Sequence, residues 1–342
     1  MTANRTTTTT TSNRYWVVGG LLAGGAVGVF LGFGLSTTPE AVGVAEPGVV
    51  VRFGHPLVRT LLDLAATIVV GLSLLPKLLG FSRPAITEPV MRIARPAAVV
   101  AAAVWAFTAL VSIVIRAYET RPDAELTMPM VVDYVQRVGA GQGLLFSAVC
   151  ALVYLWIGVM AVRRGESVPA ELRILIAMFG LLPLPVTGHA SNWKYHDYSM
   201  ISMELHVLGA AAWTGGLAAL VVLVAHRRGL LAEALPKFSK LATIALVLVS
   251  VTGLFNGLLE LALNPVVGLP GSLFTTSYGL VLVGKVVCAA LLAVLGANIR
   301  WRFLPRIAQH KTTAIVGWAA FELAVMGVAF GLAVVLSRAP VA

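Results

Sequence analysis

Residues 96–116, PAAVVAAAVWAFTALVSIVIR, form an apolar run that meets its first charged residue only at Arg116. As an α-helix this run is about 30 Å long, which matches the hydrocarbon thickness of a bilayer. Runs of about 17 to 25 apolar residues recur along the whole chain, in which 58% of the 342 residues are hydrophobic and only 12% are charged. Ordinary soluble domains are about one quarter charged. The sequence therefore predicts an all-α integral membrane protein, a polytopic helix bundle in a lipid bilayer.

The apolar runs predict about nine membrane-spanning helices. They lie at about residues 16–35, 57–79, 96–116, 143–162, 172–188, 203–225, 241–263, 278–299 and 313–336. The chain is then divided into a Thr-rich tail over residues 1–15, a transmembrane bundle over 16–336 and a short tail over 337–342. The first run is expected to remain as a helix, because no small-x-small cleavage site ends it.

The basic residues lie mostly in short loops between the runs. Of the 25 Lys and Arg residues, about 17 fall in one alternate set of loops and about seven in the other. The net charge of +10 therefore indicates orientation rather than a nucleic-acid partner, with the amino terminus cytoplasmic and the carboxyl terminus external. Cys150 and Cys288 fall inside apolar runs without a neighbouring cysteine, so neither a disulfide framework nor a CxxC metal site is predicted.

Ionisable side chains inside the predicted spans are expensive to bury and indicate function. They are Asp63, Glu204, His206, Glu260, Lys285 and Glu322. A rise of 1.5 Å per residue places Asp63, His206 and Lys285 about 9 to 10 Å below the outer surface. By the same count, Glu204 and Glu260 lie about 5 Å below it. Charged groups from four helices are therefore predicted to share one layer.

This layer has two interpretations. In the first, the charged groups form a path for a cation, and Glu322, near the midplane, continues that path inward. In the second, Lys285 pairs with Asp63 or Glu260 and the pair only stabilises the bundle. Asp63 is the better partner, because Glu260 lies nearer the surface and can reach water.

Histidines gather at the predicted external face and indicate a metal site there. Four of the six histidines lie at this face, namely His55, His189, His196 and His206. A short loop brings His189 and His206 back to the same membrane level. Imidazole binds zinc, copper, iron and nickel, so the histidines alone do not choose the metal.

Methionines at the same face narrow the choice, because a thioether is a soft ligand that suits Cu(I) better than zinc. They are Met128, Met130, Met200 and Met203. The first two are expected in a polar loop, where packing explains them poorly. The last two share a helical face with Glu204, and there core packing is an equally good explanation.

Two stretches carry a resemblance to a known family. In residues 187–223, TGHASNWKYHDYSMISMELHVLGAAAWTGGLAALVVL, the motif H-x6-W-x-G-G runs from His206 through Trp213 to Gly216. Residues 276–305, TSYGLVLVGKVVCAALLAVLGANIRWRFLP, contain Y-G-x5-K and the basic exit N-x-R-x-R-x-L-P. These motifs resemble the copper resistance D (CopD) family of bacterial membrane proteins, with a core at about residues 175–310. The layout is also similar to the amino-terminal half of actinobacterial fusions of this domain to a cytochrome oxidase assembly domain.

The resemblance implies copper transport or handling at the bacterial cytoplasmic membrane, with Cu(I) favoured and the external histidines as the copper contact. Trp213 would then cap the site or line the path. An external copper-binding protein or an oxidase assembly factor is the implied partner. Catalysis is not expected, because neither HExxH nor a nucleophile and base pair occurs. Two alternatives stay open: a b-type haem protein with His189 and His206 as axial ligands, and an assembly factor that transports nothing.

Overall fold

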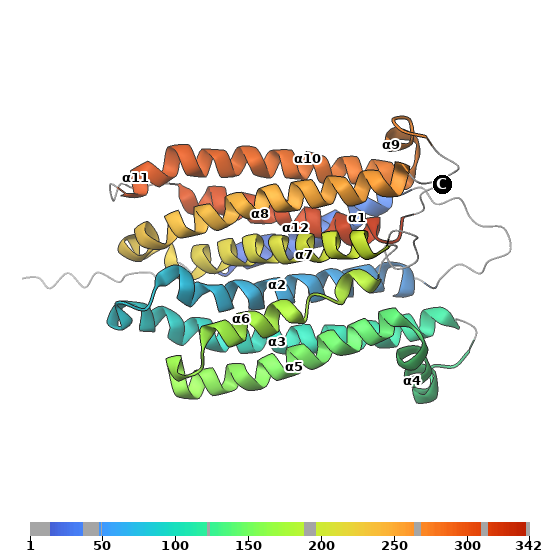
Figure 1. Cartoon of the computed structure of the whole chain (residues 1–342), viewed down its shortest axis with the longest axis horizontal. Coiled ribbons are helices and arrows are strands. Elements are labelled where there is room, and N and C mark those ends of the chain that lie inside the picture. Colours follow the sequence, from blue (N-terminus) through green and yellow to red (C-terminus); the bar gives the residue numbers. More distant parts are fainter. Residues whose placement is uncertain are drawn as a thin grey trace, which may run out of the picture.

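The computed structural model describes residues 14–36, 48, 50–121, 124–187, 196–262, 268–308 and 314–339. These residues form helices and turns without a β-strand, which confirms the predicted all-α class. Eight of the described helices are long and apolar enough to cross a membrane. These eight are α1 (Trp16–Leu35), α2 (His55–Leu79), α3 (Pro84–Thr120), α5 (Gly139–Arg164), α7 (His196–Ala219), α8 (Arg228–Ala262), α10 (Ser277–Asn298) and α12 (Ile315–Leu336). They lie side by side in one elongated bundle (Figure 1).

The first and last of these helices, α1 and α12, pack backbone against backbone. A Cβ atom on Gly24 would lie 2.3 Å from the carbonyl oxygen of Ala324, and one on Gly28 would lie 2.2 Å from that of Val328. Only residues without a side chain allow this approach. Because the matched positions advance together, α1 and α12 run in the same direction. The chain therefore crosses the bundle an odd number of times between them.

One further crossing, the fifth in chain order, is made by a broken segment. The prediction of a continuous helix over residues 172–188 is wrong, because α6 (Ala170–Phe179) ends early and a turn leads into a 3-10 helix at Leu184–Thr187. Pro183 and Pro185 lack a backbone N–H, and each disfavours helical geometry in the residue before it. Figure 1 shows α6 running along the bundle between α2 and α5. The hydropathy of this segment predicts a crossing, but its prolines prevent a regular helix.

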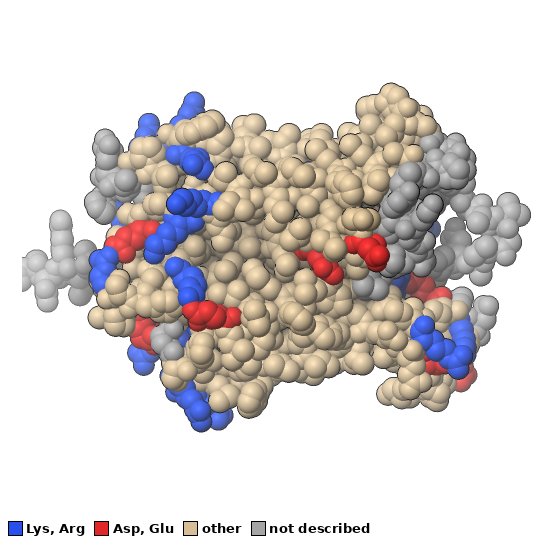
Figure 2. Space-filling view, in the orientation of Figure 1, with Lys and Arg blue, Asp and Glu red and all other residues tan. Residues whose placement is uncertain are grey.

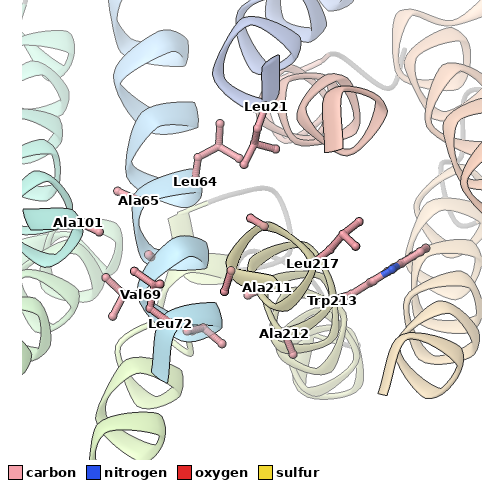
Figure 3. Packing of buried hydrophobic residues seen from close by; sticks show 14 of the residues in the cluster. Leu21, Leu64, Ala65, Val69, Leu72, Ala101, Ala211, Ala212, Trp213 and Leu217 are labelled. Atoms are coloured by element: carbon pink, nitrogen blue, oxygen red, sulfur yellow. The ribbon is translucent and has the colours of Figure 1, made fainter. Parts of the chain in front are cut away.

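At the centre of the bundle, α2 and α7 also touch through glycine. A Cβ atom on Gly71 would lie 2.0 Å from the carbonyl oxygen of Gly215. Figure 3 shows Leu72 of α2 and Ala211 of α7 in this central packing, with Trp213 extending from α7 away from α2. The far side of α7 therefore faces the helices α8, α10 and α12.

The two ends of the bundle differ in charge. Basic side chains gather at the end where α1 and α12 begin, which we call the basic end, and the broad middle is nearly uncharged (Figure 2). Ion pairs at this end include Lys77–Glu171, Arg83–Glu233 and Arg95–Glu88. Because positive residues favour the cytoplasmic side, the basic end is the predicted cytoplasmic face. The opposite end, where α2 and α7 begin, is the predicted external face.

Candidate functional site

Near the opposite end, α7 and α8 meet through a column of hydrogen-bonding side chains. Asn256 of α8 donates from Nδ2 to Oγ of Ser202 on α7 at 3.0 Å. Closer to the midplane, Oγ1 of Thr252 lies 3.2 Å from Nδ1 of His206. Gly253 leaves room for this imidazole, since a Cβ atom there would lie 2.9 Å from Cε1 of His206. The sequence did not predict the column, because spacing along one helix does not reveal which face meets a neighbour.

The proton on His206 can be placed from this column. Thr252 donates its hydroxyl hydrogen to the carbonyl oxygen of Leu248, 2.6 Å away, because a carbonyl can only accept. The Thr252 oxygen must then accept from Nδ1–H of His206. With Nδ1 protonated, the neutral imidazole has its lone pair on Nε2, the form in which histidine ligates a metal. His206 is thus held in a state suited to metal binding.

Lys285 of α10 lies close enough to His206 for its charge to act on the imidazole. Within the described chain, Lys285 forms no ion pair or hydrogen bond. The predicted pairing of Lys285 with Asp63 or Glu260 is therefore wrong. The depth count gives only a position along the membrane normal, whereas pairing also depends on how each helix is rotated about its axis.

Asp63 is instead paired within its own helix. Nε of Arg59 lies 3.0 Å from Oδ1 of Asp63, and Nη2 of Arg59 donates to the carbonyl oxygen of Leu184 at 3.2 Å. Leu184 belongs to the broken crossing, where backbone carbonyls lack the partners that a regular helix supplies. Such backbone is tolerated at membrane depth only when it is buried in protein or lines a cavity. The Asp63–Arg59 pair therefore supports the break in the fifth crossing.

The two glutamates of the outer layer are less enclosed. Glu204, two residues before His206 on α7, is half-buried and forms no ion pair or hydrogen bond within the described chain. Glu260 is also half-buried and lies close enough to Tyr278 for its charge to act on the phenol. Acidic side chains are visible over α7 within the otherwise uncharged band (Figure 2). Carboxylates at this level favour the approach of a cation.

His55 has a different environment from His206. It is buried at the start of α2, and its Nδ1 lies 2.8 Å from Nη1 of Arg338. A guanidinium group can only donate, so Nδ1 accepts and the proton of neutral His55 is on Nε2. Arg338 also pairs with Glu119 near the end of α3. His55 therefore joins α2, α3 and the residues after α12, and its lone pair is already used.

The remaining predicted ligands on α7 and before it are only partly described. His189 and the side chain of His196 lie outside the described residues, so their roles stay predictions. Met200 and Met203 are half-buried near the start of α7. Among the described residues, no three His, Cys, Asp or Glu side chains are grouped to hold a metal ion. A site at His206 would therefore need methionine or side chains that lie outside the described residues.

Met128 and Met130 begin a helix, so the expectation of a polar loop is wrong. The segment MPMVVDYV forms most of α4 (Met128–Arg137), which packs against α3 and α5. Met130 is only 6% exposed and belongs to this packing, whereas Met128 is 73% exposed. Of the two, Met128 is the one whose thioether is accessible.

A cavity of about 470 Å³ lies between α7, α8, α10 and α12 toward the basic end. Arg300 and Trp301, in the π-helical turn Ile299–Phe303 that follows α10, line its mouth. Trp213 and Glu322 line it deeper in the bundle. Glu322 is 2% exposed, and its carboxyl group is hydrogen-bonded to Trp213, while Oε2 has no partner.

The fold and these groups define a polytopic membrane protein with histidine and other ionisable side chains inside its bundle. Residues 50–197 match the family described as Copper resistance protein D-like, N-terminal domain, and residues 232–336 match Copper resistance protein D. The chain belongs to the copper resistance D (CopD) family. The two matches reach beyond the core predicted at about residues 175–310 on both sides.

The chain is also similar to one characterised relative over part of its length. It is 33% identical over 129 residues to the copper transport protein CutJ of Bacillus subtilis (strain 168). The match covers 36% of this chain and 23% of CutJ. No solved structure matches the chain. The family and this relative place the chain among proteins that handle copper at a membrane.

Proposed function

We propose that this protein carries copper across the bacterial cytoplasmic membrane, with capture at the predicted external end and passage toward the basic end. The observation that carries the proposal is His206, whose Nδ1–H is held by Thr252 and whose Nε2 is left with the lone pair. Membership of a copper-handling family supports copper as the metal.

The proposed capture site combines His206 with His189, His196, Met200 and Met203. The three helical residues with described side chains are near the start of α7, and the preceding residues would complete the ligand set. Imidazole and thioether together favour Cu(I). Met128, exposed on α4, would collect copper for this site.

The proposed path runs along α7 from the capture site to the cavity at the basic end. His206 and Trp213 are seven residues apart and therefore share one face of α7. Lys285 lies close to His206 on this path, and its charge opposes the binding of copper there. Glu204 and Glu260 would attract the ion at the entrance. Glu322 lines the inner cavity at its deeper part.

Copper flux into protein-containing vesicles tests this proposal. Purified wild-type protein should admit Cu(I), kept reduced with ascorbate, whereas His206→Ala should remove both flux and bound copper. His226→Ala is the matched control, because His226 is exposed beyond the end of α7 near the basic end. Copper flux and binding that persist in His206→Ala would refute the site. A Soret absorption band in the purified protein would support the haem alternative instead.

A further inference from the structure

Glu322 is a buried carboxyl group without a cationic partner. Its only charged companion in the wall of the cavity is Arg300, among the residues that the structure describes. Nη1 of Arg300 donates to Oγ1 of Thr243 at 2.6 Å. The remainder of the described wall is mostly aliphatic and aromatic. An ionised carboxylate in such surroundings is costly unless a cation accompanies it.

The other helices around α12 do not supply that cation. Arg14, just before α1, lies about 12 Å along the axis from the level of Glu322. On α10, Lys285 is seven residues from Leu292 in the cavity wall, about 10 Å toward the opposite end. On α2, Arg59 is paired with Asp63.

On α7, the ionisable residues nearest in sequence to Trp213 are His206 and Glu204, and His206 lies about two helical turns away. The helix α8 brings only Ser239 and Thr243 as polar residues to the described wall of the cavity. The cation that neutralises Glu322 must therefore enter the cavity.

The lining of the cavity favours a proton over copper as that cation. Cu(I) prefers thioether, thiolate and imidazole ligands, and the described lining contains no Met, Cys or His. A proton needs only the carboxylate oxygen. Oε2 is buried and unpartnered, so it can carry the proton without breaking the hydrogen bond to Trp213.

We propose that Glu322 binds a proton that enters through the cavity at the basic end and leaves along the copper path toward the opposite end, in exchange for copper. The inference rests on the transport proposed above and names its coupling ion. With the path empty, the carboxyl group is neutral. When a copper cation passes, the O–H bond breaks, the proton leaves toward the opposite end, and the carboxylate compensates the charge of the ion. No oxidation or reduction is involved.

The decisive experiment measures copper accumulation in vesicles of phosphatidylethanolamine and phosphatidylglycerol under an imposed pH gradient. For one proton exchanged per copper ion, an interior one pH unit more acidic should raise accumulation by about tenfold. Glu322→Gln should lose the response to the gradient, because glutamine resembles the protonated acid but can neither release a proton nor supply the compensating charge. Glu322→Asp should keep the response. Glu233→Gln, at an exposed surface ion pair of the basic end, is the matched control.

A second measurement keeps the two proposals separable. The infrared C=O band of a protonated carboxyl group should weaken as pH rises in the wild type and be missing from Glu322→Gln. Copper entry that ignores the gradient in the wild type, or a response retained by Glu322→Gln, would overturn the exchange while the transport function stands. A wild type that moves no copper would overturn both transport and exchange, and the infrared band would still decide whether Glu322 titrates.

Discussion

Two charged sites inside the bundle differ in how their charges are compensated. In the amino-terminal half, Asp63 is matched by Arg59, and the pair also holds a carbonyl of the broken crossing. In the carboxyl-terminal half, neither Lys285 nor Glu322 forms an ion pair within the described chain, and Oε2 of Glu322 has no hydrogen-bond partner. Both a paired and an unpaired charge cost free energy at membrane depth. The difference fits a structural role for the Asp63 site and agrees with the cation path proposed above for the helices that carry Lys285 and Glu322.

The largest effect is expected from breaking the compensated pair. Asp63→Ala should destabilise the protein by about 3 kcal/mol, because the partly buried Arg59 would keep its charge at membrane depth without the carboxylate. Thermal unfolding in detergent measures this loss. The control is Asp133→Ala, because Asp133 forms an i,i+4 pair with the mostly exposed Arg137, and exposed pairs contribute about 0.2–1 kcal/mol.

The double variant Arg59→Met with Asp63→Leu sharpens this test. It should recover most of the lost stability, since buried ion pairs can be replaced by apolar residues with little penalty. Equal instability of the single and double variants would show that the charge imbalance is not the cause.

The sequence predicted the crossings well because membrane thickness is a constraint along one dimension. Each apolar run has to span about 30 Å, and its length can be counted directly. The break in the fifth crossing was missed although Pro183 and Pro185 signal it, since hydropathy outweighed the local backbone chemistry. The i,i+4 spacing of Arg59 and Asp63 likewise carries the signal for their pair.

Contacts between helices were much harder to predict. The depth count groups His206 with Lys285 at one level, and the structure does bring the charge of Lys285 close to the imidazole of His206. It could not reveal that His206 faces Thr252 or that Arg59 bonds the broken segment, because the rotation of each helix depends on packing such as the contact of Gly71 with Gly215. The predicted partner His189 lies outside the described residues and stays a prediction.

The next effect concerns the positioning of His206. Thr252→Val should lower copper affinity about 10–100-fold, as the loss of an outer hydrogen bond to a metal-binding histidine does. Equilibrium copper binding to purified protein measures it. Thr108→Val is the control, because Thr108 is also buried and bonds the carbonyl four residues before it, but on α3. An unchanged copper affinity in Thr252→Val would show that Thr252 does not position His206.

A smaller effect is expected from Lys285. Lys285→Met removes a positive charge near His206, so copper should bind several-fold more tightly, with thermal stability unchanged or raised. Combined with Asp63→Asn, the effects on stability should add within about 0.5 kcal/mol, as expected for groups without a shared contact. A larger coupling energy would restore the pairing that the structure contradicts.

The smallest effect separates the two methionines of α4. Leucine keeps the volume of methionine but removes the sulfur, so Met128→Leu and Met130→Leu should each change stability by less than about 1.5 kcal/mol. Because Met128 is 73% exposed and Met130 only 6%, only Met128→Leu should reduce copper uptake. The reduction should appear at low external copper, where collection limits entry, and vanish when copper is abundant. Uptake measured across a range of copper concentrations checks this. Equal loss in Met128→Leu at every copper concentration would place Met128 in the path itself. Loss in Met130→Leu alone would show that burial against α3 and α5 does not prevent a thioether from binding the ion.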